Sequence, residues 1–325
     1  MQSNAIFNIK TSAEFEDLAL QSFKHQWEFN AIYKRFCNHL GIDPSGINTV
    51  EKIPFLPIQF FKQFDVLASQ NPVQTIFTSS GTTGSVTSKH LVTDLDLYVK
   101  SFREGFKLHY GNIEEYTVLA LLPSYLERDG SSLIVMVDQL IKDSKKEESG
   151  FYLNDYPGLS EKLKRLDAEG EKILLIGVSF ALLDLTEAFQ FNLNNTIVME
   201  TGGMKGRRKE LIRDELHQLL KNGFGVDKIH SEYGMTELLS QGYSKGDGIF
   251  TTPPWLRVYM RDTEDALQLV PEGVTGGINV IDLANHNSCP FIATQDLGKK
   301  LDGNRFEILG RFDTSDIRGC NLMVF

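Results

Sequence analysis

Strand-like and helix-like segments alternate between residues 118 and 230, and this alternation limits the possible folds more than any other feature of the chain. Apolar runs of strand length lie at 118–122 and 133–137, and further strand-like segments lie at 172–176, 196–199 and 228–230. Helix-like runs lie at 160–166, 180–189 and 209–220. Such alternation is typical of parallel strands that are joined by crossover helices. We therefore expect an α/β core with largely parallel pairing.

The regions on either side of this core have a different pattern. Residues 11–40 carry apolar side chains at helical spacing, with a capping-box pattern at Thr11 and Glu14 and a stop at Gly41, so we expect one long helix. Short strand-like runs predict an antiparallel barrel or meander near the carboxyl end, at 256–260, 266–270, 277–283, 291–293 and 305–309. The predicted domains are a core of residues 1–255, with a helical segment over about residues 1–70, and a β-rich subdomain of residues 256–325.

The composition argues against several classes of protein. The chain has 325 residues and a net charge of −10, so its surface is acidic on average and nucleic acid is not expected as the main partner. Three cysteines, Cys37, Cys289 and Cys320, are too few and too far apart for a disulfide framework or a metal site. They favour a reducing compartment. With no signal-peptide pattern and no apolar run of membrane-spanning length, we expect a cytoplasmic protein.

A run of eight small residues, TSSGTTGS at 78–85, follows the apolar residues 75–77. It has little apolar area to bury, but its glycines let successive backbone N–H groups point into one concavity, and its hydroxyls add donors. A phosphate is the natural ligand of such a concavity, whereas a flexible linker would have a similar composition. The run lacks the spacing of a Walker loop, and no G-x-G-x-x-G pattern follows a strand-like run.

Three further clusters combine polar or charged residues with glycine. In the heptapeptide SEYGMTE, Glu237 could hold Mg²⁺ and Thr236 could donate to a phosphate, or both could cap a following helix. In GGMKGRRK at 202–209, cations at the start of a helix oppose its dipole unless an anion is bound, and a solvated basic turn is the alternative. Near the carboxyl end, Asp296 could accept from two ribose hydroxyls and Arg311 could supply a cationic fork.

Four of these segments resemble, in order, the motifs of the adenylate-forming superfamily of acyl-CoA synthetases, luciferases and peptide-synthetase adenylation domains. Residues 79–84 with Lys89 look like its phosphate loop, and residues 233–237 match its Y-G-x-T-E motif. Residues 294–296 are similar to its T-G-D motif, and residues 310–313 to its G-R-x-D motif. The resemblance covers most of the chain, and the order of the four motifs is more specific than any one of them.

The resemblance implies a fold and a set of site residues. The fold would be a large α/β domain of mostly parallel sheets flanked by helices, with a small antiparallel β subdomain. ATP and Mg²⁺ would be the cofactors, with Mg²⁺ on Glu237 and with Thr236 and Lys89 in catalysis. The residues implied to bind the phosphates of ATP are Ser79, Ser80, Gly81, Thr82, Thr83, Gly84, Lys205, Arg207 and Arg208. Those implied to bind adenine or ribose are Gly202, Gly203, Tyr233, Gly234, Asp296 and Arg311.

Within the superfamily, the chain most resembles the acyl-protein synthetases of the LuxE type, through residues 121–128, 200–209 and 231–241. That family activates a fatty acid with ATP and transfers the acyl group to a protein cysteine, so the resemblance implies an acid–thiol ligase. Its partners would be a long-chain fatty acid and a protein thiol acceptor, with an acyl reductase or carrier protein as a further partner. An acyl pocket is expected at Pro123, Ser124, Tyr125, Gly177 and Val178.

Cys320 is the candidate acyl acceptor within the chain. Thioester formation needs a thiolate, and Arg318 nearby would lower the pKa of the thiol. The alternative is a small buried residue of the last strand, which is the commonest environment of a cysteine.

Two departures from the superfamily pattern are visible. Gln295 stands where the superfamily has glycine, and fifteen residues follow Gly310. The superfamily carries a mobile C-terminal domain with a catalytic lysine at that place, so we expect no separate lid domain. Lys89, or the basic cluster at residues 205–209, would then supply the missing positive charge.

Three rival functions remain open from the sequence. Residues 177–181, GVSFA, nearly match the G-x-S-x-G elbow of a serine acyl hydrolase, with Ser179 as nucleophile and His217, His230 or His286 as base. An acyl- or aryl-CoA ligase that uses a lid domain in trans is the second. The third is a binding module that retains a nucleotide site but has no activity.

Overall fold

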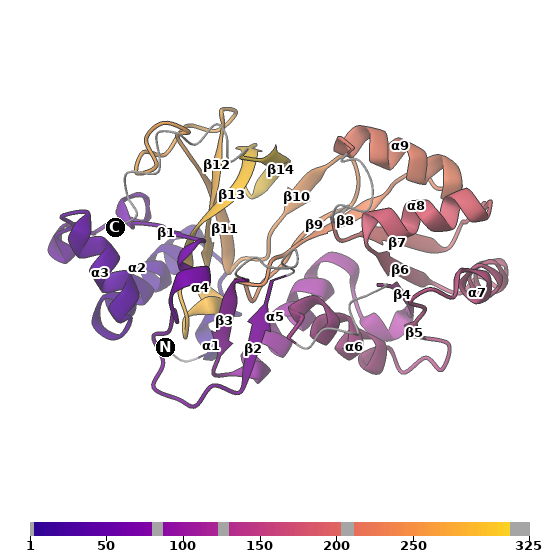
Figure 1. Cartoon of the computed structure of the whole chain (residues 1–325), viewed down its shortest axis with the longest axis horizontal. Helices are drawn as coiled ribbons and strands as arrows, with labels where there is room; N and C mark the ends of the chain where they lie inside the picture. The colour runs from indigo at the N-terminus through magenta and orange to yellow at the C-terminus, as the bar shows by residue number, and fades with distance from the viewer. Residues whose placement is uncertain (1–2, 80–86, 123–129, 203–210, 313–325) are drawn as a thin grey trace. The chain divides into compact units, whose positions relative to one another are not determined.

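The computed structural model describes residues 3–79, 87–122, 130–202 and 211–312, and these form two compact units (Figure 1). The first unit contains the described residues up to 101, together with 235–241 and those from 251 onward. The second contains residues 102–234 and 242–250. The predicted domain boundary near residue 255 stays a prediction.

The second unit contains the predicted parallel sheet. Its strands run in the order β5-β4-β6-β7-β8-β9-β10, and the neighbours from β5 to β8 are parallel, while β8 and β9 are antiparallel. Strand β6 is buried at every position, as expected where helices cover both faces of a parallel sheet. The strands are β4 (Thr117–Leu121), β5 (Gly150–Phe151), β6 (Ile173–Gly177), β7 (Thr196–Glu200), β8 (His230–Tyr233), β9 (Gly242–Ser244) and β10 (Ile249–Thr251).

Helices follow these strands as the alternation predicted. Helices α8 and α9 lie side by side in Figure 1 and contact each other. Helix α5 carries the division between the units, which falls after Ser101. The helices are α5 (Leu95–Tyr110), α6 (Ser132–Ser144), α7 (Tyr156–Ala168), α8 (Ser179–Ala188) and α9 (Arg213–Phe224), with a 3₁₀ turn η3 (Ile113–Glu115).

One predicted strand of this unit is wrong. Residues 133–137 lie in helix α6, whose first turn is capped by the hydroxyl of Ser131, which accepts from the backbone N–H of Ile134. The helix buries Met136, Val137 and Leu140 along one face. Five apolar residues fit either structure, and the helical period becomes visible only over the longer segment.

The first unit contains the predicted antiparallel strands. Strands β11 to β14 form a meander in chain order, and β1 pairs with β13 in parallel. A separate hairpin joins β2 to β3. The strands are β1 (Leu56–Pro57), β2 (Thr75–Thr78), β3 (Lys89–Val92), β11 (Leu256–Arg261), β12 (Thr275–Asp282), β13 (Phe291–Lys300) and β14 (Arg305–Arg311). The strand expected at 266–270 is reduced to one bridge, between Arg261 and Leu269.

The amino-terminal helix is divided in two. Helix α2 (Ser12–Phe29) starts with the predicted capping box, and Gly41 has the positive φ of 68° that suits a helix end. Between α2 and α3 (Ala31–His39), the extended residue Asn30 ends one helix and caps the next. Its amide also donates to the side chain of Gln26 and to the carbonyl of Ser288, so tertiary contacts hold the break. The remaining helical pieces are α1 (Ser3–Ile6), α4 (Phe60–Gln63), η1 (Pro44–Gly46), η2 (Val50–Lys52) and η4 (Leu283–Asn285).

Residues 235–241 are anchored in the first unit by buried polar contacts. The Asp282 carboxylate accepts from the backbone N–H groups of Leu239 and Ser240 at 2.9 and 3.0 Å, and from the Ser240 hydroxyl at 2.6 Å. The indole N–H of the fully buried Trp255 donates to the hydroxyls of Ser101 and Ser240. These contacts hold the segment that carries Thr236 and Glu237.

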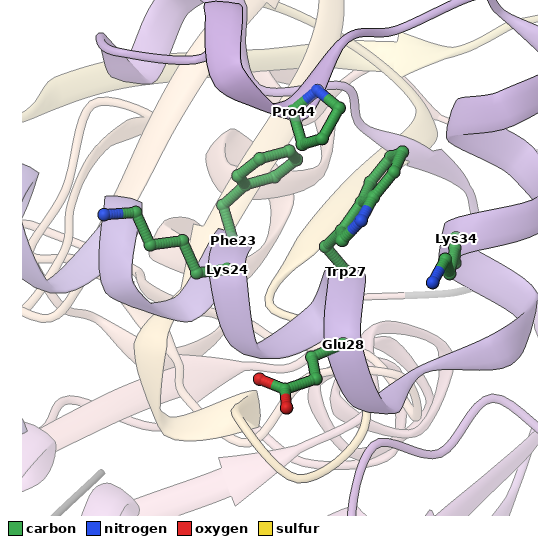
Figure 2. Close-up of a pocket in the computed structure, with 6 residues that line it drawn as sticks. All are labelled: Phe23, Lys24, Trp27, Glu28, Lys34 and Pro44. Carbon is green, nitrogen blue, oxygen red and sulfur yellow. The ribbon is translucent and has the colours of Figure 1, made fainter.

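Two observations concern the surface and the membrane. A hollow of about 290 Å³ lies over α2, α3 and η1, lined by Phe23, Lys24, Trp27, Glu28, Lys34 and Pro44 (Figure 2). These lining residues include none that was assigned to ATP or to the acyl group. Among the residues that the structure describes, no helix has the length and apolarity to cross a membrane.

Candidate functional site

The β2–β3 hairpin brings together described residues on either side of the glycine-rich run. The backbone N–H of Ser79 donates to the carbonyl of Ser88 at 3.2 Å, and the N–H of Ser88 donates to the Ser79 hydroxyl at 2.9 Å. Lys89 is exposed at the start of β3, opposite Thr78. Ser80, Gly81, Thr82, Thr83 and Gly84 lie outside the described residues. The described residues that flank the run, Ser79 and Ser88, therefore lie together.

The carboxyl group of Glu237 lies at the end of this hairpin. The Ser88 side chain hydrogen-bonds to it, and Glu237 is only 5% exposed. Burial raises the pKa of the Glu237 carboxyl, while the hydrogen bond from Ser88 and the positive charges of Lys62 and Arg311 act in the opposite direction. Ser88, which directly precedes the predicted Lys89, thus contacts a residue of the second predicted motif that lies about 150 residues further along the chain.

Backbone contacts hold the neighbouring Thr236 in place. The Nδ1 atom of His90 lies 2.8 Å from the carbonyl oxygen of Thr236, and the Asn285 amide donates to the carbonyl of Glu237 at 2.7 Å. A carbonyl can only accept, so His90 donates through a protonated Nδ1. Burial lowers the pKa of His90 to about 4, which keeps the ring neutral at physiological pH.

Asp296 and Arg311 are cross-strand partners on β13 and β14. The guanidinium Nε of Arg311 lies 3.3 Å from a carboxylate oxygen of Asp296. The Arg311 side chain is 85% exposed, whereas that of Asp296 is 12% exposed. An exposed ion pair of this kind contributes little to stability, so the guanidinium can turn toward a ligand at low cost.

In the second unit, the predicted adenine-binding residues follow the ends of β7 and β8. Gly202 has a φ of +74°, which favours glycine, and its N–H donates to the carboxylate of Glu200 at 2.6 Å. Tyr233 ends β8, with its ring edge-on to that of Phe250 at 6.1 Å, and Gly234 follows it. The carboxyl ends of neighbouring parallel strands are the usual place for ligands in α/β sheets.

The acyl-pocket residues that are described lie at the end of β6. Gly177 has no room for a side chain, because a Cβ there would come within 2.9 Å of Leu182 and 3.0 Å of the Leu121 carbonyl. Val178 is fully buried. Pro123, Ser124 and Tyr125 lie outside the described residues, so the acyl pocket stays a prediction.

Several other predicted site residues also lie outside the described residues. They are Gly203, Lys205, Arg207, Arg208 and Cys320. Their assigned roles stay predictions. Cys37 and Cys289 are described, and both are buried with free thiols.

The serine-hydrolase alternative gains no support from the position of Ser179. Its hydroxyl donates to the carboxylate of Glu200 at 3.2 Å, and the residue is 2% exposed. The imidazole of His217 lies instead 3.4 Å from the hydroxyl of Ser231. A buried serine that donates to an acid has neither the access nor the base that a nucleophile needs.

The structure also reveals site residues that the sequence reasoning missed. His90, Asn285 and Asp282 hold the Thr236–Glu237 segment, and Glu200 holds the turn at Gly202. His90 follows the predicted Lys89 directly, which is a local signal. Glu200 lies two residues before the predicted Gly202, which is a second local signal. Asn285 and Asp282 act through contacts distant in sequence, and no spacing pattern marks them.

Comparisons with known proteins agree with this geometry. The family model described as acyl-protein synthetase, LuxE, matches residues 8–100 and 155–325. The long-chain-fatty-acid–luciferin-component ligase of Vibrio harveyi is 23% identical over 363 residues, covering 97% of this chain and 94% of that protein. The ligase of the same name from Photorhabdus luminescens is 34% identical over 68 residues, which are 21% of this chain and 58% of that protein.

Solved structures with the same fold are adenylate-forming enzymes. An open conformation of 2-hydroxyisobutyryl-CoA ligase, in complex with its acyl-AMP and CoA, matches with a TM-score of 0.66 and 14% identity over 93% of this chain and 70% of that one. ATP-bound MatB from Rhodopseudomonas palustris matches with a TM-score of 0.52 and 17% identity over 76% of this chain, which is 48% of that one. The fold, the contact between Ser88 and Glu237 and the extent of the family match agree, and the chain belongs to the LuxE family of acyl-protein synthetases, which are ligases.

Proposed function

We propose that this protein uses ATP to activate a long-chain fatty acid as the acyl-adenylate and then transfers the acyl group to a protein thiol. The observation that carries the proposal is the contact between the hairpin end at Ser79 and Ser88 and the buried carboxyl of Glu237. In the proposed site this contact would bring the phosphate-binding loop next to a carboxylate that can hold a metal ion. The family membership and the fatty-acid ligase from Vibrio harveyi support the choice of acid.

Glu237 would hold a Mg²⁺ ion in this site. Burial raises the pKa of its carboxyl, so a cation beside it would compensate for the buried charge. Within the described residues, no group of three or more His, Cys, Asp and Glu side chains is arranged to hold a metal. Mg²⁺ usually needs only one or two carboxylates when phosphates supply further ligands. When bound, Mg²⁺ would neutralise charge on the phosphates and orient them.

The first reaction is an attack of the fatty-acid carboxylate oxygen on the α-phosphorus of ATP, with pyrophosphate as the leaving group. Backbone and hydroxyl donors that begin at Ser79 would stabilise the negative charge that builds on the phosphates. The Thr236 hydroxyl would donate to the α-phosphate, and Lys89 and Arg311 would add positive charge. In the second unit, Tyr233 would contact adenine.

The second reaction is an attack of a thiolate on the acyl carbon, which forms a thioester and releases AMP. Burial raises the pKa of the Cys37 thiol to about 12 and raises that of Cys289 as well. Both are therefore poor nucleophiles. This leaves Cys320 or a thiol of another protein as the acceptor.

ATP–pyrophosphate exchange, measured across carboxylic acids of increasing chain length, tests the first step. We expect exchange that depends on the acid and is greatest with long-chain fatty acids. Absence of exchange with every acid would refute the proposal and would favour a binding module without activity, which ATP would still protect from unfolding.

Labelling with a radioactive fatty acid tests the second step. We expect hydroxylamine-sensitive label on the protein that is lost in the Cys320→Ser variant but retained in Cys37→Ser. Equal labelling of wild type and Cys320→Ser would exclude Cys320. A product that forms only with CoA, without labelled protein, would exclude transfer to a protein and indicate a CoA ligase.

A further inference from the structure

The Glu200 carboxylate at the end of β7 is the centre of a buried polar cluster in the second unit. It is 3% exposed and accepts from the Gly202 N–H at 2.6 Å and from the Ser179 hydroxyl at 3.2 Å. Its other oxygen lies 3.3 Å from a guanidinium nitrogen of Arg213 and 3.6 Å from Nε2 of His217. Ser231 on β8 completes the cluster, since its hydroxyl contacts both Arg213 and His217.

The charge of Glu200 depends on these neighbours. Burial alone would raise the pKa of the carboxyl, but the hydrogen bond from His217 and the charge of Arg213 outweigh it, and the pKa falls to about 2. Glu232, on the adjacent strand, shows the opposite effect, because burial and the charge of Glu200 raise its pKa to about 8. Glu200 is thus ionised at neutral pH while its acidic neighbour holds a proton.

A cluster of this kind is an inefficient way to stabilise a fold. Removing charges from water costs several kcal/mol per ion, and apolar side chains of similar volume often stabilise a protein more. What the cluster does provide is geometry. Glu200 holds both Gly202, which has the positive φ of 74°, and Arg213, at the start of α9. These two residues flank residues 203–210, which lie outside the described part of the chain.

We propose that Glu200 is a positioning residue for nucleotide binding, acting by fixing the backbone turn at Gly202 between β7 and α9. The inference rests on the proposed function, in which Gly202 lies against adenine. Without the carboxylate, the turn loses its hydrogen bond and Arg213 loses its buried partner. The backbone beside the nucleotide would then sample several conformations, and ATP would bind more weakly.

The opposite end of β7 offers a matched control. Asp167 on α7 is 5% exposed, and its carboxylate accepts from the backbone N–H groups of Asn194 and Asn195 and from the Thr196 hydroxyl at 2.7 to 3.0 Å. It therefore holds the turn before β7 much as Glu200 holds the turn after it. Its removal should reduce stability but leave the turn at Gly202 unchanged.

The test compares Glu200→Gln and Glu200→Ala with Asp167→Asn and Asp167→Ala. Because one hydrogen bond to a charged group is lost at the turn, we expect the KM for ATP to rise about tenfold to hundredfold in Glu200→Ala. The kcat and the KM for the fatty acid should change much less. Glu200→Gln keeps an acceptor for Gly202 and should recover part of the loss. Both Asp167 variants should keep the KM for ATP within about twofold of wild type.

Hydrogen exchange at the Gly202 amide, measured without nucleotide, tests the contact itself. Faster exchange in the Glu200 variants than in the Asp167 variants supports the inference. Unchanged exchange overturns it, and so does an unchanged KM for ATP in Glu200→Gln and Glu200→Ala. A wild-type protein that lacks pyrophosphate exchange would refute the proposed function instead. The two failures are distinguishable because the amide measurement needs no ATP.

Discussion

The variant His90→Asn should lose much less stability in acid than the wild-type protein. His90 is fully buried, and its neutral ring donates to the Thr236 carbonyl. Its pKa falls from 6.5 to about 4 in the folded state. The unfolded chain therefore binds a proton between these two values that the folded protein does not. The stability due to the neutral ring is complete above pH 6.5 and is lost as the pH falls toward 4.

The magnitude follows from the two pKa values. Linkage predicts that the wild-type protein loses about 2 kcal/mol of unfolding free energy between pH 7 and pH 4.5 because of His90 alone. An Asn amide cannot take up this proton, yet its nitrogen lies close to the position of Nδ1 and can still donate to Thr236. At pH 7 the variant should be about 1–2 kcal/mol less stable, because the ring contacts with Phe61 and Phe77 are lost.

Urea unfolding at a series of pH values measures this difference. Between pH 7 and pH 4.5, the unfolding free energy of His90→Asn should fall by about 2 kcal/mol less than that of the wild-type protein. His39→Asn, at an exposed position near the end of α3, should follow the wild-type curve. If His90→Asn loses as much stability in acid as wild type, then His90 is not a neutral, buried donor and the reasoning is wrong.

Three further substitutions test other contacts. Glu237→Gln should lower the rate of ATP–pyrophosphate exchange by about 100-fold or more, and it should not reduce stability because it removes a buried charge. The control Glu272→Gln, which changes an exposed ion pair, should alter neither the exchange rate nor the stability. Equal rates of pyrophosphate exchange in Glu237→Gln and wild type would exclude Glu237 from catalysis. Asp282→Ala should lower the unfolding free energy by about 3 kcal/mol, because it leaves the buried N–H groups of Leu239 and Ser240 without an acceptor. A decrease of less than about 1 kcal/mol would contradict this role of Asp282. Asn30→Ala removes a helix cap and two buried hydrogen bonds, so the melting temperature should fall by several degrees. An unchanged melting temperature would show that other contacts hold the break between α2 and α3.

The sequence predicted the class of the fold because its evidence is local. Strand and helix periods over residues 118–230 indicated a parallel α/β sheet, and the structure has one in the second unit. Errors arose where short segments carried too little information. The five apolar residues 133–137 fit a strand as well as the helix they form, and the break at Asn30 depends on its contacts with Gln26 and Ser288. The expected cytoplasmic location stays a prediction.

For the candidate site, too, the sequence predicted residue types but not the contacts between them. Glycine, hydroxyl and carboxylate residues at family spacing predict roles for Ser79, Thr236 and Glu237, because phosphate and metal chemistry restrict the residue types at each position, and these roles stay predictions. Their meeting could not be read from the chain, since the hydrogen bond between Ser88 and Glu237 joins positions about 150 residues apart.

Thus the sequence alone determined the family and the α/β class, because these depend on local patterns, while the residues assigned to ATP and Mg²⁺ stay predictions. Only the tertiary structure decided that His90 is neutral, that Glu237 is buried beside the hairpin, and that Glu200 holds the turn at Gly202. Protonation states and backbone turns of this kind depend on burial and on partners brought together by folding, and neither is written in the spacing of residues.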